Sequence, residues 1–434
     1  MRELTAGEDT RGRVPYAEWY LNALRVPGSA TARYHQSTYG GFPYADFRAQ
    51  FAANAAAVDF ADWVRLFAQA GARYVVMVAR HLDGYPLWPT QVTNPHVPVD
   101  YRSSRDLVGD LTQTVRAQGL RMGLYYGGVD WTFTTRPVRT MTDLMRQQAL
   151  GPAYARYATA QWTELVDRYQ PSILWNDLGW PAESDLNKLF ARYYERVADG
   201  VVNDRWTQLR LPANRLARAA YLRLVSLMLK VMARAGRSLP ARPPTFHVDF
   251  QTHEYATPDP APTTAWELTR GLGRSFGYNA KETAADALTG TALVHLLADV
   301  VAHGGNLLIN VGPDGTGHIP DLQRQPLREL GAWLEANGEA IYGTRPWTRA
   351  AATTTAGDQV RFTRKQRTVY AIVLSDALGD GLTIRDLVLP AGTRIGTLNG
   401  AAGLAWAQAD TDVRIAPPPQ PPGQHAQVLT ITMP

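Results

Sequence analysis

Short apolar runs that alternate with amphipathic helical stretches are the feature of this sequence that most limits its fold. Seven runs in the first three-quarters of the chain are typical of strands: residues 73–79, 121–126, 172–177, 200–203, 245–249, 275–278 and 306–311. Runs that are apolar throughout and are separated by helices form parallel sheets. Seven such runs exceed half of a Rossmann domain, and Gly271-Leu-Gly273 lacks the offset of its glycine fingerprint. The pattern therefore predicts a (β/α)₈-type TIM barrel.

The pattern changes after Trp347. Short segments with alternating apolar residues follow, separated by Gly, Pro and Asp turns: residues 360–363, 369–374, 382–384, 393–395, 413–415 and 428–432. This pattern predicts an antiparallel β-sandwich, with Pro417–Pro422 as a loop in polyproline II form. We therefore expect a catalytic barrel over residues 1–347 and a β-sandwich domain over residues 348–434.

Composition excludes several classes of protein. The chain has 434 residues and no cysteine, so neither a disulfide nor a thiolate metal site can form. The net charge of +5 is scattered, without the aromatic and basic motif of a nucleic-acid binder. No apolar stretch approaches the roughly 20 residues of a membrane span, and the N-terminus lacks the apolar region of a signal peptide. From this the chain as given is expected to be cytoplasmic.

The carboxyl ends of the predicted strands carry the polar residues suited to chemistry, because active residues of parallel barrels lie there. These are His81 and Asp83, Tyr125 and Tyr126, Trp175 and Asp177, Asn203, Asp204 and Arg205, and Asp249 and Glu254. Two carboxyl groups that act as nucleophile and acid/base, with aromatic rings and cations around them, are what glycoside hydrolysis needs. The set at consecutive strand ends therefore favours a sugar site.

Each of these residues also has a purely structural interpretation. Asp177 can cap the next helix, and this interpretation is as good as a catalytic one for the residue taken alone. Trp175 within a strand can belong to the core, and His81 can be a structural histidine. Glu254 can be a loop carboxylate, and Arg205 can pair with its neighbour Asp204.

Ten motifs in order resemble glycoside hydrolase family 29, the α-L-fucosidases, and most closely its bacterial branch. They are Pro15-Tyr-Ala-Glu-Trp-Tyr20, Ala70-Gly-Ala-Arg-Tyr74, Arg80-His-Leu-Asp-Gly-Tyr85, Arg105-Asp-Leu-Val-Gly-Asp110, Gly123-Leu-Tyr-Tyr126 with Asp130-Trp131, Ile173-Leu-Trp-Asn-Asp177, Val202-Asn-Asp-Arg205, Phe250-Gln-Thr-His-Glu-Tyr255, Ser275-Phe-Gly-Tyr-Asn279 and Gly305-Asn-Leu-Leu-Ile-Asn-Val-Gly-Pro313. The resemblance runs from about residue 13 to the C-terminus.

The resemblance implies a role for individual residues. Asp177 matches the nucleophile of a retaining mechanism, and Glu254 matches the acid/base. The positions that match the lining of the fucose pocket are Glu18, Trp19, His81, Tyr125, Trp175 and Arg205. It implies an exo-acting α-L-fucosidase that acts on fucosylated oligosaccharides or glycans and needs no cofactor and no metal.

Two departures from the family pattern keep alternatives open. The family's opening strand, which ends in a histidine, has no counterpart here, so the barrel is expected to lack its first strand and to have an open seam. We interpret this as a misplaced start or a genuine loss, and a loss would favour a catalytically impaired carbohydrate-binding relative. Leu82 replaces the second of two histidines that the family usually has, which leaves a retaining glycosidase on a related sugar as a further alternative.

An added basic segment covers about residues 208–240. Arg210, Arg215, Arg218, Arg223, Lys230, Arg234 and Arg237 punctuate an apolar helix there, and no acidic residue lies between Arg205 and Asp249. Such a helix can cover the mouth of a site, join copies in a homo-oligomer, or lie on a membrane. The sequence favours a lid or a subunit contact over a membrane surface.

Overall fold

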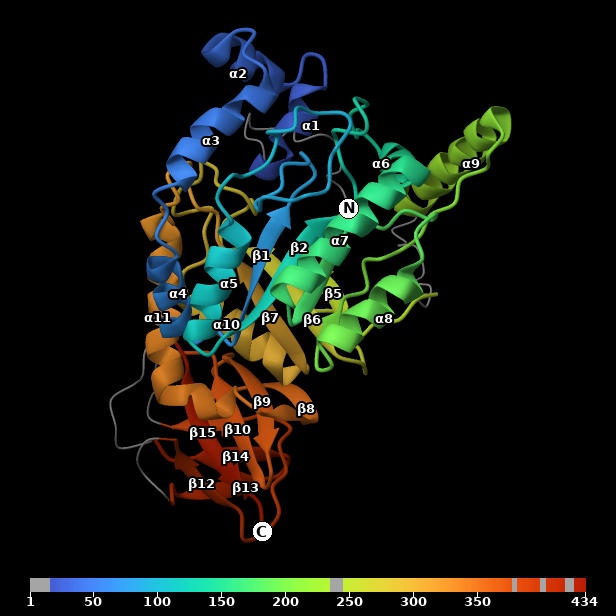
Figure 1. The fold of residues 1–434 in the computed structure, drawn as a ribbon. Coiled ribbons are helices and arrows are strands. Elements are labelled where there is room, and N and C mark those ends of the chain that lie inside the picture. The colour runs from blue at the N-terminus through green and yellow to red at the C-terminus, as the bar shows by residue number, and fades with distance from the viewer. Residues whose placement is uncertain (1–15, 235–244, 377–380, 399–402, 418–424) are drawn as a thin grey trace.

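The computed structural model describes residues 16–234, 245–376, 381–398, 403–417 and 425–434. Parallel strands surrounded by helices form the larger part of the molecule, and two antiparallel sheets lie at one end of it (Figure 1). The polyproline loop expected at 417–422 lies outside the described residues, apart from Pro417. Among the described helices, none is long and apolar enough to cross a membrane.

The parallel strands belong to two sheets that together give the incomplete barrel predicted from the sequence. One sheet has the order β1-β2-β3-β4 and the other β5-β6-β7. A parallel bridge between Asn203 and Phe250 connects them. The strands are β1 (Tyr74–Arg80), β2 (Arg121–Gly127), β3 (Ile173–Asp177), β4 (Val201–Val202), β5 (Gln251–Glu254), β6 (Trp266–Gly271) and β7 (Gly305–Asn310).

Two of the predicted strands were wrong. Residues 245–249 do not form a strand and end in a bend. At Asp249 the amide donates to the Val202 carbonyl (3.0 Å), and the carboxylate accepts hydrogen bonds from the Val202 amide (2.7 Å) and from Tyr194 (2.5 Å). Residues 275–278 form a loop after β6. The strands in their place are β5 and β6. We missed β6 because the charged residues Glu267 and Arg270 interrupt its apolar pattern.

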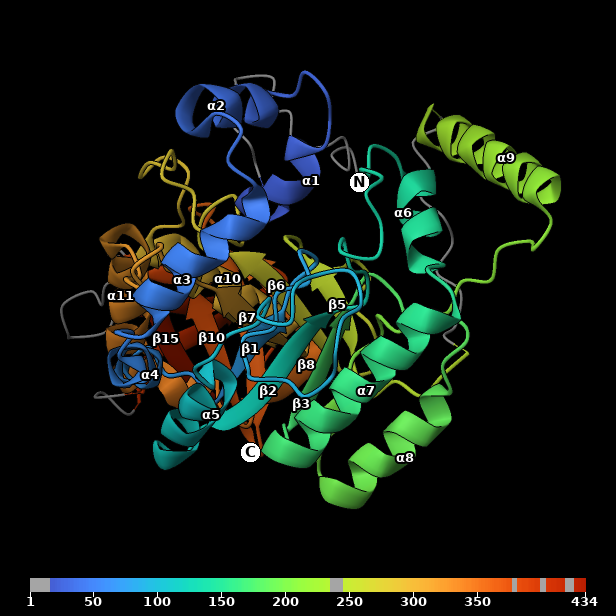
Figure 2. The same ribbon diagram turned by 45° about the horizontal axis from the view of Figure 1, so that its top comes forward.

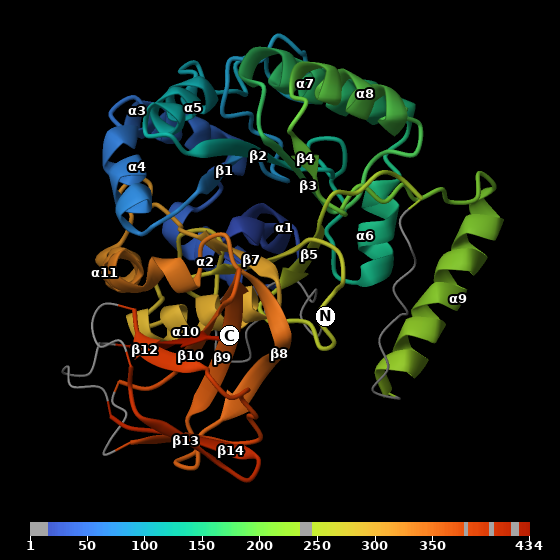
Figure 3. The same ribbon diagram turned by 90° about the horizontal axis from the view of Figure 1, so that it is seen from below.

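Helices surround the two parallel sheets, and several of them cover the outer faces of these sheets (Figures 1 and 3). The N-terminal ones are η1 (Ala17–Trp19), α1 (Tyr20–Leu24), α2 (Ala30–Tyr39), η2 (Tyr44–Asp46), α3 (Phe47–Ala55) and α4 (Phe60–Gln69). The others are α5 (Leu107–Ala117), α6 (Met141–Gln148), α7 (Pro152–Tyr169), α8 (Leu186–Arg196), α9 (Arg215–Arg234), α10 (Gly290–Ala302), α11 (Asp321–Asn337) and η3 (Gly338–Ala340). Apolar faces of α4, α5, α7 and α8 share one buried cluster with β1 to β4.

A seam separates β7 from β1. No backbone ladder joins these two strands in the described part of the chain, as the missing first strand led us to expect. The view from below shows them standing apart, with α4 and α11 on the outside (Figure 3). A cavity of about 1680 Å³ extends from the strand ends into this seam. Its apolar lining there comes from both strands and both helices: Trp63, Phe67, Val76, Val78, Leu308, Leu330 and Leu334.

The antiparallel strands form a five-stranded sheet in the order β12-β15-β10-β9-β8 and a three-stranded sheet in the order β11-β14-β13. They are β8 (Arg345–Thr353), β9 (Gln359–Lys365), β10 (Thr368–Val373), β11 (Leu382–Ile384), β12 (Arg394–Thr397), β13 (Trp406–Ala409), β14 (Asp412–Ile415) and β15 (Gln427–Thr432). One apolar cluster lies between the sheets, as a sandwich requires. Of these strands, β8 and β13 had not been predicted.

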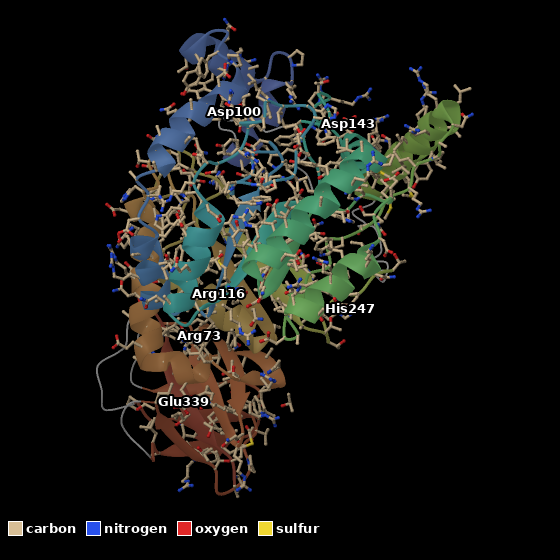
Figure 4. The ribbon with its side chains drawn as sticks, viewed as in Figure 1. Arg73, Asp100, Arg116, Asp143, His247 and Glu339 are labelled. Carbon is tan, nitrogen blue, oxygen red and sulfur yellow. The ribbon has the colours of Figure 1, made fainter. Side chains whose placement is uncertain are left out.

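The lower ends of the parallel strands face the antiparallel sheets. Arg73, which precedes β1, lies near this junction (Figure 4), and its guanidinium carbon is 3.9 Å from the centre of the Tyr342 ring. The Trp333 indole of α11 donates a hydrogen bond of 3.1 Å to the Ala426 carbonyl before β15. The carboxyl ends of the strands, at the opposite end of the barrel, are therefore free to form a site.

A fully buried ion pair fixes the loop after β2. Arg80 at the end of β1 pairs with Asp130, and neither side chain is exposed. Arg80 also donates to Tyr154 (3.1 Å) and to the Gly127 carbonyl. Removing one partner of a buried pair leaves a charge without compensation.

We therefore expect Asp130→Asn to lower the free energy of unfolding by about 3–5 kcal/mol. Denaturant unfolding measures this. The matched control is Asp46→Asn, which breaks an exposed pair with Arg48 at 2.9 Å and should change stability by no more than about 1 kcal/mol. Equal effects of the two variants would contradict the prediction.

Candidate active site

The eight residues predicted to form the site line one cavity. They are Glu18, Trp19, His81, Tyr125, Trp175, Asp177, Arg205 and Glu254. The cavity lies at the carboxyl ends of the parallel strands, the end of the barrel that is turned towards the viewer in Figure 2. Asp177 ends β3 and Glu254 ends β5, while His81 follows β1 directly. Residues that the strand-end rule selected therefore share one cavity, although His81 and Glu254 are 173 positions apart in the sequence.

Arg205 bridges the two carboxylates. Its Nη1 lies 3.0 Å from Asp177 Oδ1 and 2.6 Å from Glu254 Oε1. Asp177 Oδ1 and Glu254 Oε1 are therefore no more than about 5.6 Å apart. This limit is shorter than the about 6.5–9.5 Å of an inverting pair and is compatible with the about 5–5.5 Å of a retaining pair.

Asp177 is held by three donors. Tyr125 donates a hydrogen bond of 2.8 Å to Oδ2, while the Leu178 amide (2.9 Å) and Arg205 donate to Oδ1. Leu178 has φ of 60°, a left-handed conformation that is costly for a branched side chain. Such strain persists where the surroundings enforce it, and it often marks functional sites. Asp177 does not cap a helix, since Asp185 caps α8 instead.

Three rings form a stacked wall beside Asp177. His81 and Tyr125 are 5.8 Å apart between ring centres and nearly parallel, and Tyr125 and Trp175 are 5.5 Å apart. The Arg205 guanidinium lies 5.0 Å from the centre of the Trp175 ring. An apolar wall next to two carboxylates suits the apolar face of a sugar ring.

Glu18 and Trp19 enter the cavity from the segment before α1. Ser275 and the Gly277 amide each donate a hydrogen bond of 3.0 Å to Glu18 Oε2. Trp19 packs edge-on against Trp131, with ring centres 5.4 Å apart. The loop at 275–278 therefore holds the Glu18 carboxylate through these hydrogen bonds instead of pairing as a strand.

The structure adds residues that sequence reasoning missed. Thr252 accepts a hydrogen bond of 2.7 Å from Arg205 Nε, and Asp204 Oδ1 accepts one of 2.7 Å from Thr252. Arg205 thus pairs with the two carboxylates and not with Asp204. Glu267 of β6 accepts hydrogen bonds from Trp175 Nε1 (2.8 Å) and Tyr74 (2.5 Å) beneath the ring wall. No sequence signal identified Glu267, because the strand that carries it was not predicted.

Four of the strand-end residues face away from the cavity or take structural roles. Asp83 accepts a hydrogen bond from Tyr44 (3.1 Å), and Tyr126 donates one to Gln161 (2.8 Å) in the core. Asn203 donates to the Asn176 carbonyl (2.8 Å), and Asp249 holds the turn before β5. Among the described residues, no three His, Asp or Glu side chains are grouped to hold a metal ion.

Burial sets the protonation of several groups in the site. It raises the pKa of Glu18 and of Glu267 above their ordinary values, although hydrogen bonds from Gly277 and Tyr74 act against the shift. Burial acts to lower the pKa of Arg205, but the charges of Asp177 and Glu254 outweigh it and raise this pKa. Arg205 is thus a permanent cation between the two carboxylates.

Comparison with known proteins agrees with this geometry. The family model described as α-L-fucosidase matches residues 6–339. The chain belongs to the α-L-fucosidase family. It is 30% identical over 389 residues to the α-L-fucosidase of Dictyostelium discoideum, covering 85% of this chain and 76% of the relative. The tissue α-L-fucosidase of Rattus norvegicus is 28% identical over 405 residues, covering 91% and 79%.

The solved structure of Thermotoga maritima α-fucosidase in complex with fucose superposes with a TM-score of 0.81 and 39% identity. The match covers 99% of this chain and 92% of that one. The family assignment and the TIM-barrel fold with a C-terminal β domain, both expected from the sequence, are confirmed. The family consists of glycoside hydrolases, so the chain belongs to an enzyme family.

Leu82 does not face the cavity of this α-L-fucosidase family member. Its side chain is 1% exposed and belongs to an apolar cluster with Trp131 and Val129. Leu82, which stands where the family usually has a histidine, therefore packs in the core beside Trp131 and Val129. This packing gives no support to the idea that Leu82 changes the sugar specificity.

Protonation of His81 makes the stability of the fold depend on pH. Burial lowers its pKa to about 4, with Arg80 acting in the same direction and Asp177 in the opposite one. Because this pKa lies below the ordinary 6.5, the unfolded chain binds the proton more readily. The stability that neutral His81 contributes is present above pH 6.5 and is lost as the pH falls towards about 4.

We expect the free energy of unfolding to fall by up to about 3 kcal/mol across this window, beyond the contribution of other groups. His81→Asn should show a shallower decline between pH 6.5 and 4, whatever its stability at neutral pH. Denaturant unfolding at a series of pH values measures the slope. The exposed His96, changed to Asn, is the control and should keep the steep slope; a steep slope in both variants would refute the assignment.

Proposed function

We propose that this protein is a retaining exo-α-L-fucosidase that hydrolyses terminal α-L-fucosyl linkages of oligosaccharides or glycans. The observation that carries the proposal is the bridge by which Arg205 holds Asp177 and Glu254 at the spacing of a retaining pair. The relatives' names and the fucose named in the Thermotoga maritima structure support the choice of sugar.

In the proposed first step, an Asp177 oxygen attacks the anomeric carbon and the bond to the leaving oxygen breaks. Glu254 gives its proton to that oxygen, and a covalent fucosyl-enzyme remains. Tyr125 and Arg205 keep the Asp177 carboxylate oriented before the attack. Glu254 must release Arg205 to act as the acid, and its 38% exposed side chain has room to do so.

In the second step, Glu254 as a carboxylate takes a proton from water. The water attacks the anomeric carbon from the side of the departed alcohol and frees Asp177. Two inversions at the same carbon retain its configuration. Trp175 and His81 supply the apolar wall, while Glu18 and Arg205 are placed to bind hydroxyl groups.

The test is release of nitrophenol from an aryl α-L-fucoside by the purified chain, together with the anomer formed first, observed by NMR. We expect release, with α-L-fucose as the first product. First formation of the β anomer would exclude the retaining assignment. A panel of aryl galactosides and arabinosides shows whether a related sugar is preferred.

The open seam favours a second candidate, a carbohydrate-binding relative with impaired catalysis. The cavity continues from Asp177 into the gap between β1 and β7, so one wall of the sugar pocket is incomplete in the described structure. This candidate predicts that fucose binds, as measured by calorimetry, while the aryl fucoside is not hydrolysed. The nitrophenol assay therefore separates the two candidates.

A further inference from the structure

Helix α9 carries a feature that the proposed hydrolysis does not use. It spans 20 residues, about 30 Å at 1.5 Å per residue. It packs against α6 and projects outwards from the barrel, as Figures 1 and 3 show from two directions. The segment between Arg205 and Asp249, in which it lies, contains no acidic residue.

One face of α9 is packed and the opposite face is apolar but exposed. Leu222, 2% exposed, lies on the packed face with the half-buried Val225 and Leu229. Leu216, Leu224, Leu227 and Val231 follow the helical spacing along the other side and are 55–81% exposed. A soluble helix usually leaves its solvent face polar, so this second apolar face needs a partner.

A basic edge borders the exposed apolar face. Arg223, Lys230 and Arg234 recur at helical spacing beside it, and all three are exposed. Within the described residues, none of them takes part in an ion pair, whereas Arg218 bonds to the Pro212 and Ala213 carbonyls. The edge therefore presents free positive charge next to apolar side chains.

The position of α9 argues against a lid. Met141 and Leu144 of α6 line the catalytic cavity, and no described residue of α9 does so. Helix α9 lies on the other side of α6, away from Asp177 and Glu254. A second copy of the chain also fits poorly, because pairing two α9 helices through their apolar faces would bring basic edges together with no acid on either helix.

We propose that α9 lies flat on an anionic lipid surface. Leu216, Leu224, Leu227 and Val231 insert into the boundary between headgroups and acyl chains, and the basic edge contacts lipid phosphates. An anionic membrane matches both parts of the helix. Its acyl boundary can take up the apolar face, and its negatively charged headgroups complement the basic edge. The proposal replaces the lid or subunit contact favoured by the sequence, and it does not depend on the hydrolytic activity.

The test is co-sedimentation of the full chain with vesicles of phosphatidylcholine alone or with 30% phosphatidylglycerol. We expect binding to the anionic vesicles, weak binding to the neutral ones, and release at high salt, which screens surface charge. Reversing the charges of Arg223, Lys230 and Arg234 to Glu should weaken partition about 100-fold or more, from roughly a factor of five per cation. Leu224→Asp should also abolish binding.

Matched controls separate the helix from general charge and hydrophobicity. Val388→Asp, at a site of equal 67% exposure on the β domain, should bind like the wild type. Reversal of Arg364, Arg394 and Arg414 to Glu changes the net charge equally and should have little effect. Vesicle binding that is absent, or that persists in both α9 variants, would overturn the proposal. So would dimerisation in solution that Leu224→Asp abolishes, because it would identify a second copy as the partner.

Discussion

Asp177→Gly should reduce turnover of an aryl α-L-fucoside by on the order of 10⁴-fold or more, because it removes the carboxylate proposed to form the covalent intermediate. The substitution removes the carboxylate and leaves space on the side of the sugar opposite the leaving group. Azide should restore part of the rate by entering that space. Since azide would displace the leaving group in a single step, the fucosyl azide should have inverted configuration.

The measurements are the rate of nitrophenol release with and without azide, and the configuration of the azide product by NMR. Asp185→Asn is a matched control, because Asp185 also follows β3 but caps α8 outside the cavity. It should keep the wild-type rate. Full activity of Asp177→Gly, or a retained azide product, would remove Asp177 from the role of nucleophile.

Glu254→Gln should slow hydrolysis by about 10²–10⁴-fold for substrates whose leaving group needs a proton. For a nitrophenyl fucoside the first step should be much less affected, since nitrophenolate leaves without protonation. The second step, which needs a base, should then limit the rate. Azide needs no base, so it should accelerate turnover and give a fucosyl azide of retained configuration.

A fucosyl disaccharide and a nitrophenyl fucoside, compared side by side, measure this difference. Glu335→Gln on the exposed side of α11 is the control and should leave both rates unchanged. An equal loss on both substrates would mean that Glu254 acts by another route, such as holding Arg205 through the contact at 2.6 Å. The opposite azide stereochemistry of the two catalytic variants distinguishes nucleophile from acid/base.

The sequence by itself was enough to predict the class of fold and the family, and its strand ends supplied most of the predicted residues that line the cavity. Apolar runs between helices predicted a parallel sheet, because strands of such a sheet are buried on both faces. The strand-end rule then located Asp177, Arg205, Trp175 and His81 without any contact being known. It could not distinguish the strand at 251–254 from the segment at 245–249, because that depends on where Asp249 finds its hydrogen-bond donors.

The tertiary structure alone decided how these residues act on one another. That one guanidinium joins Asp177 and Glu254, and that Glu267 supports the ring wall from below, depends on side-chain directions that no spacing encodes. It also decided that Leu82 is a core residue, because the turn after β1 packs its side chain against Val129 and Trp131. The sequence pattern of α9 does not say which of its two apolar sides is packed. The structure shows that the side with Leu222 is packed and that the side with Leu224 is exposed.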